Sequence, residues 1–200
     1  VAGWGETIRE VIRDGRMPPW FADERYGHFA NDSSMSEEEK QLIDQWVANG
    51  APEGDLSQLQ ETPSFTAGWL IGEPDLVVKM EEPFSVPAEG VVDYQDFRID
   101  PGFTEDVWVT AAEARPGNPS VVHHIVLFAV PKESRGSTDS MNFGQMVAIY
   151  APGMPPWQYP QGTAMCIKKN MDLVFQLHYT PNGRKQTDQS YVGLNLTTED

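Results

Sequence analysis

The hydrophobic pattern of this chain changes its period near residue 75, and this change constrains the fold more than any other feature. From there onward, apolar residues recur at every second position, as they do in half-buried β-strands. Turn-forming segments at 100–102, 115–119 and 181–183 separate the apolar runs, and their prolines argue against βαβ units. We therefore expect a mainly β protein, an antiparallel jelly-roll β-sandwich. Its strands are predicted at 76–80, 91–99, 107–112, 121–130, 145–150, 173–179 and 191–196.

The first 55 residues have a helical pattern instead. One helix is predicted to end near Gly15, because the residues before it are apolar at helical spacing (Ile8, Val11 and Ile12). A second helix has a stronger signal, since Ser36 and Glu39 form the sequence signature of a capping box. Its apolar face and its terminal Asn-Gly predict a helix over 37–49.

Between these two regions the chain is rich in Pro, Gly, Ser, Thr and Gln, which is typical of a linker. Residues 1–62 carry 5 basic and 13 acidic side chains, whereas 63–200 carry 9 and 17, so the first part is about twice as dense in net negative charge. We expect a short helical domain at 1–55, a linker at 56–74 and a β-domain at 75–200.

Composition excludes several classes of function. The formal net charge is −16, so the chain lacks the positive footprint that a nucleic-acid-binding protein needs. No apolar run approaches the roughly 20 residues that span a bilayer. The single cysteine, Cys166, excludes an internal disulfide framework and a four-cysteine zinc site. Because the sequence starts at Val1 and stops just after a predicted strand, we expect it to be a piece of a longer protein.

Three of the four histidines fall in the most apolar predicted strands. His123 and His124 are adjacent within 121–127, and His178 lies within 173–179. Burying an imidazole without a partner is unfavourable, and metal ligation is one way to satisfy it. Adjacent strand residues point to opposite faces, so the pair can share one ion only if the strand is bent or bulged there. Otherwise one imidazole faces the core and the other faces solvent.

A methionine is the second candidate ligand. Met17 lies in a Pro-Pro loop directly after the first predicted helix, and a thioether is a soft ligand for Cu(I) or haem iron. The alternative is ordinary packing. No Cys-x-x-Cys-His haem-attachment motif occurs in the sequence. We expect Cys166 to be a small buried hydrophobic residue and His28 to have a structural or surface role.

The histidine pattern resembles a known family. A consecutive His-His pair, followed 54 residues after His124 by His178 in Gln-x-His-Tyr, looks like the N-terminal domain of the type II copper, ascorbate-dependent monooxygenases. The resemblance covers about 75–200 and implies a jelly-roll β-sandwich. It also implies that His123, His124 and His178 bind one copper, the electron-transfer site, even though two of them are adjacent.

The first 55 residues resemble the C-terminal part of a bacterial c-type cytochrome domain. The resemblance lies in the segments 16–20, 23–29 and 46–52 and the capped helix between them. It implies that Met17 is the axial ligand of haem c, that the attachment motif lies in an upstream segment, and that the protein is periplasmic or otherwise extracytoplasmic.

Together these resemblances imply a redox fragment of a bacterial copper-dependent monooxygenase. Electrons would pass from haem to the three-histidine copper, then to a catalytic copper on a further C-terminal domain that hydroxylates a C–H bond with O₂. We expect this fragment alone to be inactive, and the acidic charge suits a basic redox partner. The animal enzymes are disulfide-rich and carry His-x-His on the following domain, and neither feature occurs here.

Two other functions remain open. A non-catalytic β-sandwich binding module would use exposed aromatic residues such as Trp157 and Tyr159, whereas a copper-storage or electron-relay protein would use the histidines without an oxygenase.

Overall fold

The computed structural model describes residues 1–200 except 30, 59–67, 136–143 and 199–200. The chain divides into two compact units, Val1–Pro63 and Ser64–Asp200. The predicted division into 1–55, 56–74 and 75–200 stays a prediction.

The N-terminal unit is helical, as the pattern of its apolar residues predicts. The α-helices α1 (Gly5–Arg13) and α2 (Glu37–Ala48) pack against each other, and Arg13 on α1 pairs with Asp44 on α2. Short 3₁₀ turns lie before, between and after them, at Ala2–Trp4, Glu24–Tyr26 and Leu56–Gln58. Gly15 has a φ of 67°, in the left-handed region that favours glycine, and α1 ends just before it as expected.

The capping box of α2 is confirmed. The N–H of Glu39 donates to Ser36 Oγ at 3.2 Å, and the N–H of Ser36 donates to Glu39 Oε2 at 2.8 Å. Two backbone donors that the helix itself leaves unpaired are thereby satisfied.

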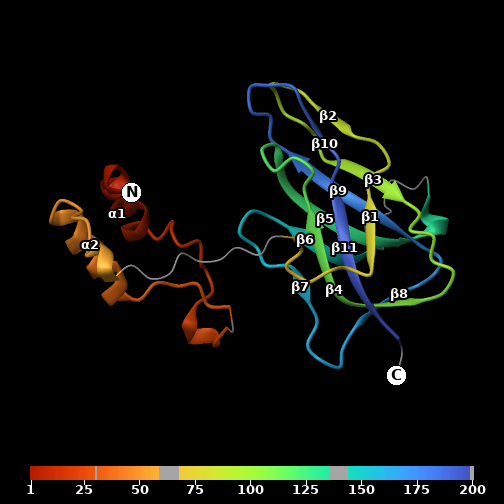
Figure 1. The fold of residues 1–200 in the computed structure, drawn as a ribbon, viewed down its shortest axis with the longest axis horizontal. Helices are drawn as coiled ribbons and strands as arrows, with labels where there is room; N and C mark the ends of the chain where they lie inside the picture. Colours follow the sequence, from red (N-terminus) through yellow and green to blue (C-terminus); the bar gives the residue numbers. More distant parts are fainter. Residues whose placement is uncertain (30, 59–67, 136–143, 199–200) are drawn as a thin grey trace. The chain divides into compact units, whose positions relative to one another are not determined.

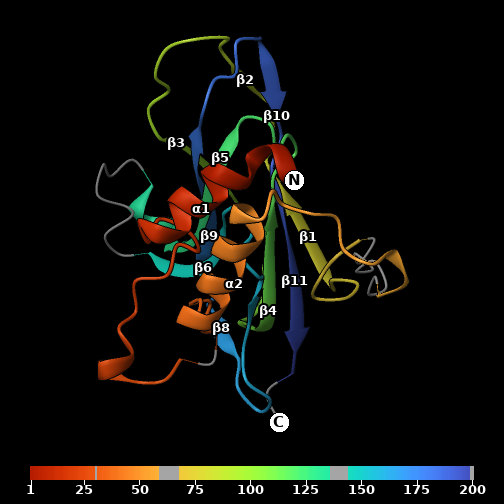
Figure 2. The ribbon, with the colours of Figure 1, turned by 90° about the vertical axis from the view of Figure 1, so that its left-hand side faces the viewer.

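The second unit is built from antiparallel sheets (Figure 1 and Figure 2). One sheet has the order β1-β11-β4-β7 with β8 also pairing with β4, a second has the order β3-β9-β5-β6, and β10 pairs with β2. The strands are β1 Leu76–Lys79, β2 Phe84–Val86, β3 Gln95–Ile99, β4 Val107–Arg115, β5 Val122–Pro131, β6 Gln145–Tyr150, β7 Trp157–Gln158, β8 Met165–Ile167, β9 Met171–Tyr179, β10 Gln186–Asp188 and β11 Tyr191–Thr197.

The two larger sheets contribute to one hydrophobic core. Its fully buried members include Val109 and Leu194 from the first sheet and Ile125, Leu127 and Phe175 from the second. The central strands β5 and β9 pack against the first sheet through this core. They also pair with each other along a ladder of nine positions. A side chain at the end of this ladder is held in a defined place.

All seven predicted strands are present, but two of their boundaries are wrong by three or more residues. Strand β4 continues to Arg115, whereas its predicted end is residue 112. The predicted strand at 91–99 starts only at Gln95, so Tyr94 lies in the preceding loop. Four further strands, β2, β7, β8 and β10, were not predicted because two or three residues are too few to display a period.

The residues just before β1 pack on the first sheet. Trp69 makes an edge-to-face contact with Tyr191 at 5.4 Å between ring centroids. A Cβ at position 193 would lie 2.9 Å from the Trp69 ring, so the glycine there allows this close approach.

Candidate metal centre

A β-bulge brings the adjacent histidines onto one site. In the β5–β9 ladder Val122 pairs with Tyr179, but the next registered pair is His124 with His178, so His123 is an extra residue on β5. An extra residue breaks the strict alternation of faces along a strand. The two adjacent imidazoles can share one ion only if the strand is bulged at the His-His pair, and β5 has this bulge.

The three imidazoles form one cluster. One ring nitrogen from each of His123, His124 and His178 lies within 4.8 Å of the others. The ring centroids are 5.0 Å apart for His123 and His178, 5.1 Å for His124 and His178, and 5.3 Å for the adjacent pair. Among the residues that the structure describes, no other group of three histidine, cysteine or carboxylate side chains comes this close together.

A bound ion would explain the short distance between two of the ring nitrogens and the missing partner of a third. His123 Nδ1 and His124 Nδ1 are 3.0 Å apart, a separation that suits two ligands of one ion whose metal–nitrogen bonds are about 2.0–2.1 Å. His178 Nδ1 is buried and has no hydrogen-bond partner within the described part of the chain. A buried ring nitrogen is normally paired, so a metal ion fits this atom.

Electrostatics favour the neutral imidazole at His124. Burial lowers the pKa of His124, and the neighbouring rings of His178 and His123 lower it further. Neutral imidazole is the form that binds a metal. His123 is exposed while the other two rings are partly buried, so the cluster opens to solvent on the His123 side.

Tyr94 covers part of the cluster. Its ring stacks on His178 with 5.1 Å between centroids and an angle of 25°, and it lies 5.6 Å from the ring of His124. The sequence did not identify this residue, because the predicted strand at 91–99 treated it as an alternating strand position. No spacing signal links a loop tyrosine to histidines that follow it by about thirty and more than eighty positions.

The residue after His178 is anchored in the core. The Tyr179 hydroxyl donates to Asp188 Oδ2 at 2.9 Å, and the same carboxylate accepts from Ser190 Oγ at 2.8 Å. Burial and the adjacent carboxylate strongly raise the pKa of Tyr179, so its hydroxyl stays protonated and continues to donate. This network fixes the end of β9 that carries His178.

Other candidate residues lie apart from the cluster or in the other unit. Met17 is half exposed in the N-terminal unit, in the loop after α1, and His28 is exposed there. Cys166 on β8 is partly rather than fully buried, so it is less enclosed than we expected. Trp157 is exposed, whereas Tyr159 is partly buried and packs against the core.

Comparison with protein-family models and with curated proteins finds no match for this chain. No helix in the described ranges combines the length and the apolar character that crossing a membrane requires.

Proposed function

We propose that His123, His124 and His178 bind one copper ion and that the β-unit serves as an electron-transfer domain. The observation that carries this proposal is the three-imidazole cluster built on the bulge of β5, in which one His178 nitrogen is buried without a partner. Copper, zinc, nickel and iron all accept imidazole ligands. Copper is preferred because it cycles between two oxidation states and because the His-His and Gln-x-His-Tyr segments resemble a copper family.

The protein's own groups have distinct roles in this proposal. His124 and His178 form a cross-strand pair at the end of a long ladder, which holds two ligands in a fixed relation. His123 provides the third ligand from the bulge and is the ring nearest to solvent. A rigid ligand set at the surface suits electron transfer, since a donor or acceptor can approach the exposed ring.

The resemblance to the type II copper, ascorbate-dependent monooxygenases extends the proposal. In that reading the β-unit is a jelly-roll sandwich that passes electrons to a catalytic copper on a further domain, where a C–H bond is hydroxylated. Met17 is proposed as the axial ligand of a haem c whose attachment motif lies in another segment, and the protein is placed outside the cytoplasm. The antiparallel sheets and the cluster support the copper part of this proposal, whereas the haem part rests on the resemblance alone.

Copper titration of the 200-residue chain, followed by electron paramagnetic resonance, tests the proposal. We expect one type II copper per chain, with binding lost in His123→Ala and in His178→Ala. His28→Ala is the matched control, because it removes an exposed histidine outside the cluster and should leave binding unchanged.

Two results would overturn the proposal. Failure to bind copper at micromolar concentration would favour a non-catalytic binding module. The second result is a site that zinc and copper fill equally in competition and in which the bound copper is not reversibly reduced. That result would leave a metal site without a redox function.

A further inference from the structure

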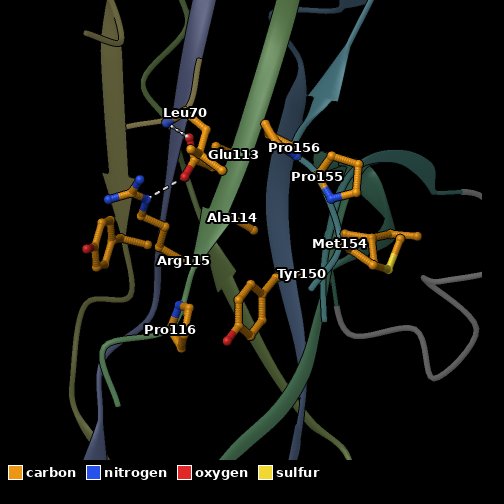
Figure 3. A pocket seen from close by; sticks show the side chains of 11 residues that line it. Leu70, Glu113, Ala114, Arg115, Pro116, Tyr150, Met154, Pro155 and Pro156 are labelled. Carbon is orange, nitrogen blue, oxygen red and sulfur yellow. Dashed lines mark hydrogen bonds and ion pairs between the residues drawn. The ribbon is translucent and has the colours of Figure 1, made fainter. Parts of the chain in front are cut away.

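Three carboxylates are buried among the residues that the structure describes, and two of them are paired with arginine. Glu113 accepts from Arg115 Nε at 2.6 Å beside a pocket at the end of β4 (Figure 3), and the Asp172 carboxylate accepts from two guanidinium groups. The third carboxylate, Asp188 at the end of β10, is 2% exposed, and its donors in the described part of the chain are neutral groups. A carboxylate buried without a counter-charge is unfavourable unless hydrogen bonds hold it, so the donors to Asp188 indicate its role.

The donors to Asp188 come from both strands that carry the histidines. Its Oδ2 accepts at 2.9 Å from the hydroxyl of Tyr179, which follows His178 at the end of β9. Its Oδ1 accepts at 2.8 Å from the backbone N–H of Asn118, in the turn that leads into β5. One carboxylate therefore ties the segment before the His-His pair to the end of the strand that carries His178.

The turn at Asn118 is itself bonded to the start of β5. The carbonyl of Asn118 accepts from the N–H groups of Val121 and Val122, each at 3.3 Å, directly before the bulge at His123. The carbonyl of Val121 accepts from the N–H of Thr180 at 2.8 Å, so the same segment is bonded to the chain just after β9. A displacement of this turn would therefore reach the bulge through backbone hydrogen bonds.

Close packing holds the turn against the end of β10. A Cβ at position 117 would lie 2.7 Å from the carbonyl oxygen of Gln189, so the glycine there allows the turn to approach the residue after Asp188. The side-chain amide of Asn118 also donates to the carbonyl of Thr187 at 3.1 Å. Backbone and side chain of Asn118 both contact β10, and the turn has one defined position there.

We propose that Asp188 is a positioning residue of the metal centre, an inference that rests on the proposed copper site. Its carboxylate fixes the turn before β5 relative to the end of β9, and this sets the distance between the bulge and the strand that carries His178. The ligands come from two strands, so a shift between these strands changes the arrangement of the three ring nitrogens without removing any of them. Groups that orient metal ligands from outside the ligand set commonly alter metal affinity.

Copper affinity and the electron paramagnetic resonance spectrum of the loaded 200-residue chain test the proposal. Tyr179→Phe keeps the buried ring, which stacks on Phe84, and removes only the hydroxyl that reaches Asp188. Asp188→Asn replaces one acceptor oxygen by an amide nitrogen and keeps the size of the side chain. We expect each variant to bind one copper about three- to tenfold more weakly than the parent chain and with a changed copper hyperfine splitting.

Matched controls separate positioning from stability. Asp172→Asn also alters a buried carboxylate of the β5–β9 pair, but at the opposite end of the ladder, where Asp172 is registered with Val130. Tyr150→Phe removes the hydroxyl of a partly buried tyrosine on neighbouring β6. Both controls should leave the copper affinity and the spectrum unchanged, even though Asp172→Asn lowers the stability of the fold.

Amide hydrogen exchange of the metal-free chain examines the same hydrogen bonds without copper. Asp188→Asn and Tyr179→Phe should each speed exchange by about threefold or more at the N–H groups of Val121, Val122 and Thr180. Unchanged exchange would overturn the inference, and so would faster exchange with an unchanged copper affinity and spectrum. Copper binding by the parent chain that both variants retain in full overturns this inference alone, whereas a parent chain that binds no copper overturns the proposed function with it.

Discussion

At the scale of single residues, the position of His123 has the largest consequence. A regular strand would direct His123 and His124 to opposite faces, whereas the extra residue in β5 places both rings beside His178. The histidines were identifiable from the sequence because they interrupt very apolar strands. The sequence indicated only that a shared ion would require a bulge. It did not predict the bulge itself, because no turn residue or glycine marks it.

Tyr94 provides a test of how firmly the cluster is held. Replacing it by alanine removes the ring that stacks on His178, and an aromatic contact contributes about 0.5–1.5 kcal/mol. We expect Tyr94→Ala to weaken copper binding by about three- to tenfold, measured by competition with a chromogenic chelator. Tyr94→Phe keeps the ring and should bind copper like the parent chain.

The control for this prediction is Tyr26→Ala, which removes an exposed tyrosine from the N-terminal unit. Equal affinities for Tyr94→Ala and Tyr94→Phe would show that the stacked ring has no role in holding the site.

Asp172 provides a second residue-scale prediction. The carboxylate is fully buried and accepts hydrogen bonds from Arg98 and Arg135, each at 2.7 Å. Burial opposes its ionisation, but the hydrogen bonds and charges of the two guanidinium groups outweigh burial and lower its pKa. Asp172→Asn should reduce the free energy of unfolding by about 3 kcal/mol at pH 7, because Arg98 is left largely buried without its counter-charge.

This loss should depend on pH. A carboxylate with a lowered folded pKa stabilises the protein above its unfolded pKa of about 3.9, and the stabilisation disappears as pH falls through the folded pKa. Urea unfolding should therefore show a difference between Asp172→Asn and the parent chain that shrinks below about pH 4. Asp96→Asn, an exposed change on neighbouring β3, should have little effect at any pH.

At the scale of elements, strongly patterned segments were predicted well and short ones were not. The capping box located the start of α2, and alternation located β5, β6, β9 and β11 closely. The two- and three-residue strands β7 and β8 exist because β4 offers them an edge, and this is a tertiary cause that a local pattern does not contain. The loop position of Tyr94 was missed because the predicted strand extended back to residue 91, whereas β3 starts at Gln95.

The capping box itself is open to measurement. Ser36→Ala removes the side-chain acceptor for the Glu39 N–H, which typically reduces helix stability by about 1 kcal/mol. We expect a lower thermal midpoint for the helical signal in circular dichroism. Ser33→Ala is the matched control, because that exposed serine lies before the helix and caps nothing in it. Equal midpoints for the two variants would show that the cap does not limit α2.

At the scale of the whole molecule, the division into two compact units predicts how the chain unfolds. Each unit has its own packed elements, Val1–Pro63 around two helices and Ser64–Asp200 around the two sheets. Separate cores unfold as separate cooperative transitions. We expect calorimetry to resolve two transitions, with Ser36→Ala shifting one and Asp172→Asn shifting the other. A single transition that both variants shift equally would contradict this prediction.

The central claim is that three imidazoles from one bulged strand and its neighbour hold a copper ion. X-ray absorption at the copper edge of the loaded 200-residue chain tests it most directly, because imidazole ligands give a characteristic scattering pattern that can be counted. We predict three imidazoles in the parent chain and loss of this pattern in His178→Ala, which should no longer hold copper. A pattern with one imidazole, or one unchanged by His178→Ala, would contradict it.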